Sequence, residues 1–153
     1  MDRLKFENLV DQAVRELPAE FRQKLENVVV LVEDRPSKEF LEDMEIPGDN
    51  TLFGLYEGTP LTERGFAPLH PDRIWIFQDP IEEECESEEE ITEEIKTTIV
   101  HEVAHFFGFD DEYVGQLAIV FLRPQMRIVR SVNQLHVYAH LVCRFLNASF
   151  QHV

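Results

Sequence analysis

The sequence has few basic residues, only two cysteines and no long hydrophobic run. Its 153 residues contain 14 Lys and Arg against 30 Asp and Glu, for a formal net charge of −16. Such an acidic chain lacks the basic surface needed to bind nucleic-acid phosphates or an anionic membrane. No apolar stretch approaches the roughly 20 residues that span a bilayer, and the charged start, MDRLKFENLV, does not fit a signal peptide. Two cysteines make no disulfide framework. We therefore expect a cytoplasmic protein with no nucleic-acid or membrane partner.

Acidic residues are also missing from one end of the chain. The last is Glu112, so all 30 acids and 10 of the bases fall in residues 1–112, while residues 113–153 hold four Arg and no Asp, Glu or Lys. This break predicts a domain over residues 1–115 and an acid-free basic extension over residues 116–153. Three explanations of the extension are open: a segment that docks on the acidic body, a segment that binds a partner, or coding sequence read in an unintended frame.

Hydrophobic patterning predicts a mixed fold. The spacing of apolar residues favours helices over residues 4–16 and 19–25. Short apolar runs bounded by Gly, Pro and Asp favour strands over residues 28–32, 52–56 and 73–78, with a surface loop over residues 61–72. The first of these runs is an unbroken series of Val and Leu, which is typical of a buried strand.

The longest predicted helix runs from residue 87 to residue 107. Ser87 and Glu90 fit a capping box at its start, and Gly108 fits its end. We interpret the acidic run at residues 82–90 as a solvated surface that supports the helix N-terminus. The fold class is therefore α+β, a small sheet packed against helices, with apolar residues of the long helix recurring at Ile91, Ile95, Ile99, Val103 and Phe106.

The same helix contains the sequence His101-Glu102-Val103-Ala104-His105, an HExxH pattern. Two histidines four residues apart stand one turn above each other, so both imidazoles can reach one metal ion. Glu102 is rotated about 100° from His101 around the helix axis. It need not bind the metal and can act as general base toward a metal-bound water. Neutral imidazoles suit zinc, and we expect one Zn²⁺ per chain.

The pattern continues to HExxHxxGxxD. Gly108 permits a positive φ that turns the chain back after the helix, so a side chain three residues later can return to the metal. This spacing favours Asp111 as the third ligand, while its neighbours Asp110 and Glu112 stay open. A ligand from a second helix further downstream is excluded because no acid follows Glu112. A second histidine pair, His136 and His140, lacks the Glu and the Gly turn, and we interpret it as incidental.

The segments HEVAHFFGFDDE, LFGLYEGTPLTERG and PDRIWIFQDPIEEE together resemble the small bacterial zincin-like metallopeptidase family, a minimal one-domain zincin. The resemblance covers roughly residues 6–113, and members normally end soon after the HExxHxxGxxD segment. It implies a zincin-like α+β domain in which His101, His105 and Asp111 hold zinc and Glu102 is the catalytic base. It also implies a substrate that lies along an exposed strand edge, for which we expect the strand at residues 73–78.

The function that we expect is hydrolysis of a peptide bond in a peptide or protein substrate, through a zinc-bound water activated by Glu102. Tyr56, His70 and Tyr113 are candidate oxyanion donors. The alternative is a zinc-containing interaction or regulatory module with little or no peptidase activity. A purely structural zinc is disfavoured, because structural sites usually close with four protein ligands.

Overall fold

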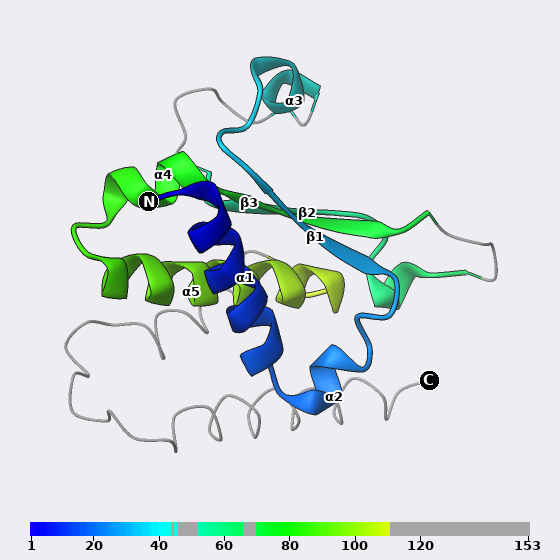
Figure 1. The fold of residues 1–153 in the computed structure, drawn as a ribbon. Coiled ribbons are helices and arrows are strands. Elements are labelled where there is room, and N and C mark those ends of the chain that lie inside the picture. Colours follow the sequence, from blue (N-terminus) through cyan, green and yellow to red (C-terminus); the bar gives the residue numbers. More distant parts are fainter. Residues whose placement is uncertain (44, 46–51, 66–69, 111–153) are drawn as a thin grey trace. The chain divides into compact units, whose positions relative to one another are not determined.

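A computed structural model describes residues 1–43, 45, 52–65 and 70–110 of the chain. Three strands and five α-helices are found in these residues, which confirms the α+β fold class (Figure 1). In chain order the elements are α1 (Arg3–Glu16), α2 (Ala19–Arg22), β1 (Val28–Glu33), α3 (Lys38–Asp43), β2 (Gly54–Glu57), the 3₁₀ turn η1 (Leu61–Glu63), β3 (Asp72–Phe77), α4 (Gln78–Glu84) and α5 (Glu88–Phe106).

The three strands form one mixed sheet with the order β1-β3-β2. Strand β1 runs parallel to β3, and β2 runs antiparallel to it. Burial alternates along the central strand β3, as expected for a strand with one face in the core. Ile74 and Ile76 are fully buried, while Arg73, which precedes Ile74, is exposed. The sheet therefore presents one apolar face to the helices.

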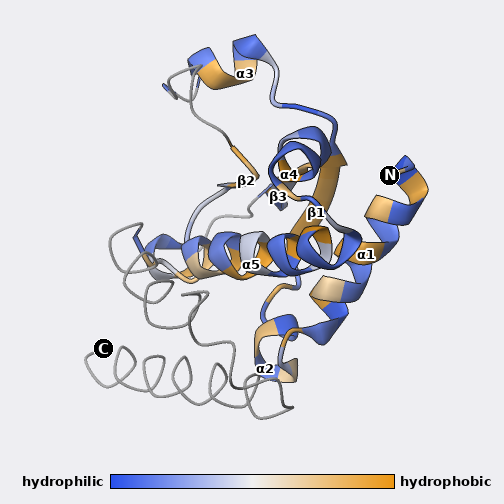
Figure 2. Ribbon diagram, turned by 90° about the vertical axis from the view of Figure 1, so that its left-hand side faces the viewer, coloured by the Kyte–Doolittle hydropathy of each residue, from blue (hydrophilic) through white to orange (hydrophobic). Residues whose placement is uncertain are grey.

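The expectation of a buried strand at residues 28–32 is wrong. Strand β1 is hydrophobic along nearly its whole length (Figure 2), yet it has no fully buried residue and Val29 is 44% exposed. The described residues pair β1 on one side only, with β3. An unbroken run of apolar residues does not show where a strand lies in its sheet. The edge strand β1 therefore has a sequence typical of a central strand.

Helices α1 and α5 pack on one side of the sheet, and α3 lies on the other (Figure 1). The buried residues of α1 follow the helical period, and α5 buries the five apolar residues whose spacing predicted it. Strand β3 contributes the buried residues on the sheet side of this core. The largest fully buried side chains, which form the core, are Phe6, Phe77, Phe106, Ile74, Ile76, Ile81, Ile95 and Ile99.

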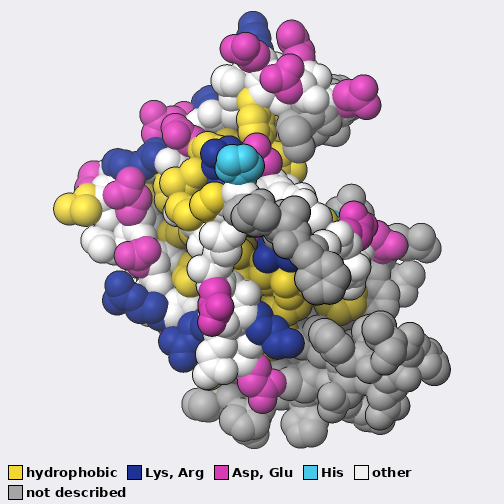
Figure 3. Space-filling view, turned by 90° about the vertical axis from the view of Figure 1, so that its right-hand side faces the viewer, with side chains coloured by type: hydrophobic (Ala, Val, Ile, Leu, Met, Phe, Trp, Pro, Cys, Tyr) yellow, Lys and Arg dark blue, Asp and Glu magenta, His cyan; other side chains and the backbone are white. Residues whose placement is uncertain are grey.

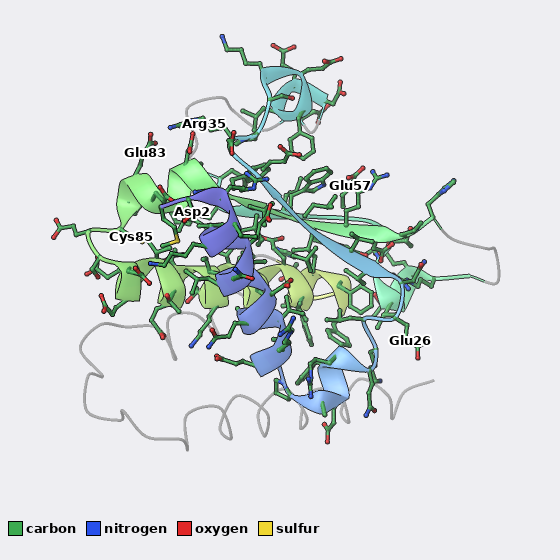
Figure 4. All side chains as sticks on the ribbon, in the orientation of Figure 1. Asp2, Glu26, Arg35, Glu57, Glu83 and Cys85 are labelled. Carbon is green, nitrogen blue, oxygen red and sulfur yellow. The ribbon has the colours of Figure 1, made fainter. Side chains whose placement is uncertain are left out.

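The start of α5 is capped by Ser87 as predicted, but the Glu90 side chain bonds to the residue before the cap rather than to Ser87 itself. Ser87 Oγ accepts a hydrogen bond from the Glu90 N–H at 3.2 Å, and the Glu90 carboxylate accepts one from the Glu86 N–H at 2.8 Å. Neighbouring acids pair with cations from other elements. Glu83 lies against Arg35 (Figure 4), and Glu88 pairs with Lys5. The acidic run at residues 82–90 thus supports the start of α5 and pairs both α4 and α5 with cations elsewhere in the fold.

Two helices were not predicted, because the residues that end a strand also begin a helix. Asp79 and Pro80 close β3, but α4 starts at Gln78 and places Pro80 in its first turn, where a backbone N–H has no helical partner to lose. Likewise Ser37, which follows β1, accepts a hydrogen bond from the Phe40 N–H at 3.1 Å at the start of α3. Strand β2 begins two residues later than expected.

The predicted boundary between residues 1–115 and 116–153 stays a prediction, because residues 111–153 lie outside the described part of the chain. Within residues 1–43, 45, 52–65 and 70–110, no helix is both long and apolar enough to cross a membrane.

Helix α5 approaches β2 closely at Gly54. A Cβ atom at this position would lie 2.5 Å from Thr98 Cγ2, 3.0 Å from the Trp75 carbonyl oxygen and 3.2 Å from Glu102 Cγ. Ordinary van der Waals separations are longer, so any side chain at Gly54 would push the helix from the sheet. The absence of a side chain here sets the height of α5 above β2.

We predict that Gly54→Ala lowers the free energy of unfolding by about 1–3 kcal/mol, because the new methyl group overlaps both a side chain and a backbone carbonyl. Urea denaturation measures the change. Gly65→Ala is the matched control, since a Cβ atom there meets nothing within 4 Å. Equal stability of the two variants would contradict the close approach.

Candidate metal centre

His101 and His105 stand one turn apart near the C-terminal end of α5. Their ring centroids are 4.8 Å apart, and the two Nε2 atoms are 3.0 Å apart. Two nitrogen ligands of one tetrahedral zinc, each at about 2.0–2.1 Å, are separated by roughly 3.3 Å. The two imidazoles therefore already converge as they would on a shared metal ion, and the donor set fits zinc.

The second ring nitrogen of His105 is held by the backbone. Nδ1 lies 2.9 Å from the Phe109 carbonyl oxygen, which can only accept a hydrogen bond. Nδ1 therefore carries the proton, and Nε2 keeps the lone pair that a metal needs. This is the usual way in which a metal-binding histidine is fixed in tautomer and orientation.

A tight turn brings the Phe109 carbonyl back to His105. Gly108 has φ +92°, a conformation that glycine adopts without the steric cost of a Cβ atom. The Gly108 N–H donates to the His105 carbonyl at 2.9 Å, and the Phe109 N–H donates to the Ala104 carbonyl at 3.1 Å. These two bonds form a Schellman motif, which confirms the predicted role of Gly108 at the helix end.

Glu102 points to the sheet side of α5 and is 6% exposed. Its Cγ lies next to Gly54 of β2, whereas His101 and His105 are half-buried on the adjacent side of the helix. The helical rotation between consecutive residues thus separates the two roles that the sequence suggested. The imidazoles occupy the more open side, and the Glu102 side chain is buried next to Gly54 of the strand.

The described residues do not identify a third ligand. No group of three or more His, Cys, Asp or Glu side chains placed to hold a metal ion occurs in residues 1–43, 45, 52–65 and 70–110. Asp110 is described and exposed, while Asp111, Glu112, Tyr113, His136 and His140 lie outside. Asp111 as third ligand therefore stays a prediction.

The sequence matches the family model for zincin-like metallopeptidases over residues 25–121. The protein belongs to the zincin-like metallopeptidase family. A search of the curated proteins found no match. The matched range contains all three strands, α5 and the turn at Gly108, so the family assignment and the histidine geometry concern the same part of the chain.

In this zincin-like domain the expected substrate strand is misplaced. Residues 73–78 correspond to β3, which is paired on both sides, by β1 and by β2. A central strand has no free hydrogen-bonding edge for a peptide. Strand β2, which pairs only with β3 among the described residues and contacts α5, is the strand with an edge beside the metal helix.

Two candidate oxyanion donors of the zincin-like site, Tyr56 and His70, lie in the described residues, where Tyr56 contacts Asp72 and Phe106 and His70 contacts Asn27. The Tyr56 hydroxyl donates to Asp72 Oδ2 at 2.7 Å, and its ring meets Phe106 edge-on. Burial, together with the Asp72 carboxylate, raises the pKa of Tyr56 well above its usual value, so the phenol stays protonated. His70 is exposed, and its backbone carbonyl accepts from Asn27 Nδ2 at 3.4 Å.

A buried cluster beside the metal helix was missed by the sequence reasoning. Asp72 is 3% exposed and accepts from both Tyr56 and Arg64. The Arg64 guanidinium also lies 4.9 Å from the centre of the Phe106 ring, next to His105 in the chain. The segment LYEGTPLTERG contains Tyr56 and Arg64, but its pattern indicates only a strand and a loop, and nothing local predicts that these side chains meet Asp72.

We predict that Tyr56→Phe destabilises the protein but does not impair hydrolysis strongly. Asp72 loses one of its two described donors, which should cost about 1–3 kcal/mol of unfolding free energy. Loss of a true oxyanion donor would lower kcat by about 10²–10³-fold. Urea denaturation and steady-state kinetics separate the two roles, and a drop in kcat of that size would make Tyr56 a catalytic residue.

Proposed function

We propose that this protein is a zinc-dependent peptidase that hydrolyses peptide bonds with Glu102 as general base. The observation that supports this most directly is the pair of Nε2 atoms 3.0 Å apart on α5, with His105 oriented by the Phe109 carbonyl. Membership of the zincin-like metallopeptidase family supports the reaction class. Together they favour a metal-assisted hydrolase.

In this proposal His101, His105 and Asp111 hold the zinc. Two neutral imidazoles and one carboxylate would be three protein ligands, the number typical of catalytic rather than structural zinc sites. When bound, zinc supplies Lewis-acid chemistry: it lowers the pKa of water toward neutrality and polarises a carbonyl group. The protein's own contribution is the orientation of the two imidazoles, which the turn at Gly108 provides.

Glu102 handles the protons. The water oxygen bonds to the scissile carbonyl carbon while Glu102 takes a proton from the water. As the C–N bond breaks, Glu102 returns that proton to the leaving amine, so the carboxylate is regenerated and one water is consumed. Burial of Glu102 against Gly54 restricts its rotamers and keeps bulk water from its sheet-facing side. Such a fixed base is what a general-base mechanism needs.

The proposed substrate is a peptide or protein segment with positive charge. The body of the chain, residues 1–112, holds 30 acids and 10 bases. Figure 3 shows Asp and Glu side chains gathered on α3 and interspersed with Lys and Arg over the rest of the visible face. A negative surface raises the local concentration of cationic ligands and speeds their association. The edge of β2 beside α5 is the proposed place for the extended backbone of such a substrate.

We predict that Glu102→Gln keeps zinc and loses about 10²–10⁴-fold in kcat, because the amide cannot accept the proton. Elemental analysis measures bound zinc, and cleavage of a mixed peptide library measures turnover. Glu94→Gln is the matched control: it is the same chemical change on the same helix, two turns before Glu102. Full turnover by Glu102→Gln would contradict the assigned base.

A second prediction concerns the metal itself. His105→Ala should lose both the bound zinc and the cleavage of the library, because the remaining ligands cannot hold the ion. One zinc in the wild type, absent from His105→Ala, would support the metal site. Zinc without cleavage would instead favour an interaction module, and a wild type without zinc would contradict the proposal.

A further inference from the structure

The loop between β2 and β3 touches the end of the metal helix at several points. We propose that Arg64 is a positioning residue for the zinc site: by fixing this loop against Phe106 and Gly108, it holds the Phe109 carbonyl on His105. The inference rests on the proposed function, because it assigns Arg64 a role in preparing His105 for a metal.

Arg64 is anchored at two points of the buried cluster. Its Nη2 donates to Asp72 Oδ2, and its Nε donates to the Thr59 carbonyl at 2.9 Å. Asp72 is almost wholly buried at the start of the central strand. The loop fits tightly there, since a Cβ atom on Gly58 would lie 2.6 Å from Asp72 Oδ1. The planar guanidinium therefore ties the loop to the sheet with directed hydrogen bonds.

The flat face of the Arg64 guanidinium lies over Phe106, in the last turn of α5. It lies 4.9 Å from the centre of the Phe106 ring, within the range of a cation–π contact. Phe106 is fully buried and also meets Tyr56 edge-on at 6.1 Å between ring centroids. Phe106 directly follows His105, so the position of its ring is coupled to the final turn of the metal helix.

Thr62 of η1 completes the link by packing on Gly108. A Cβ atom on Gly108 would overlap Thr62 Oγ1 and lie 2.9 Å from Thr62 Cγ2. The turn is thus closed on its outer side by the loop that Arg64 anchors. The next residue, Phe109, gives its carbonyl to His105 Nδ1 at 2.9 Å. Loosening the loop frees this turn, and His105 can then carry its proton on either ring nitrogen.

The test compares Arg64→Gln with Arg35→Gln. Arg35 also pairs with two carboxylates, Asp79 and Glu83, but both belong to α4. The first measurement is made on metal-free protein at pH 8, where ¹⁵N shifts of the His105 ring report which nitrogen is protonated. The second is zinc affinity, by competition with a chromophoric chelator. The third is the melting temperature of the metal-free protein.

For Arg64→Gln we expect a mixture of His105 tautomers and about tenfold weaker zinc binding, the lower end of the effect seen when groups that orient metal ligands are removed. For Arg35→Gln we expect the wild-type tautomer and affinity. A merely structural role for Arg64 would lower the melting temperature and leave both other measurements unchanged, and that result would overturn the inference.

Because Asp72 is left buried without its cation, Arg64→Gln can fail to fold. Thr62→Ala then decides, since it keeps the Arg64–Asp72 pair and removes the Oγ1 and Cγ2 atoms that pack on Gly108. It should shift the His105 tautomer in the same direction, and an unchanged tautomer overturns the inference. The ¹⁵N measurement needs no zinc. A wild type that binds no zinc would defeat the proposed function, while the tautomer shift would still test the positioning role.

Discussion

The candidate site depends on one hydrogen bond, from His105 Nδ1 to the Phe109 carbonyl. It fixes the tautomer of His105 and so decides whether the facing Nε2 pair can receive a metal. The acceptor is a backbone group only four residues away, which is possible because Gly108 reverses the chain at once after α5. The helix end and the metal ligand are therefore one structural unit, and a change in the cap is also a change in the ligand.

The Arg64–Asp72 pair is placed where it gains little stability but fixes geometry. Both side chains lose water on burial, and the attraction between them roughly repays that loss. Two apolar residues of similar size would fill the space without that cost. What apolar residues cannot do is direct a planar group onto Phe106 while bonding to the Thr59 carbonyl. This favours a role for the pair in orienting the end of α5 rather than in the overall stability of the domain.

The sequence alone predicted the parts of the site that depend on local periodicity. The apolar spacing located α5, the HExxH spacing placed both imidazoles on one side of it, and Gly108 marked its end. It did not predict the features that depend on strand order. Nothing in the local sequence distinguishes an edge strand from a central one, so β1 was expected to be buried and β3 to have a free edge, whereas β1 is at the edge and β3 is central. The contact of Arg64 with Phe106 joins residues 42 positions apart, beyond the reach of local patterns. The third ligand, Asp111, stays a prediction from spacing.

The distribution of charge links the fold to the proposed substrate. Among the described residues, ion pairs with acids are formed by Arg3, Lys5, Arg15, Arg35, Arg64, Arg73 and Lys96. All of these cations except Arg15, which pairs with Asp11 within α1, link separate parts of the fold, and the body keeps a large excess of acids over bases. That excess gives little to stability, because exposed like charges repel one another. Its physical effect is to attract cationic ligands over about one Debye length, so the proposed preference for basic peptides should weaken as salt rises.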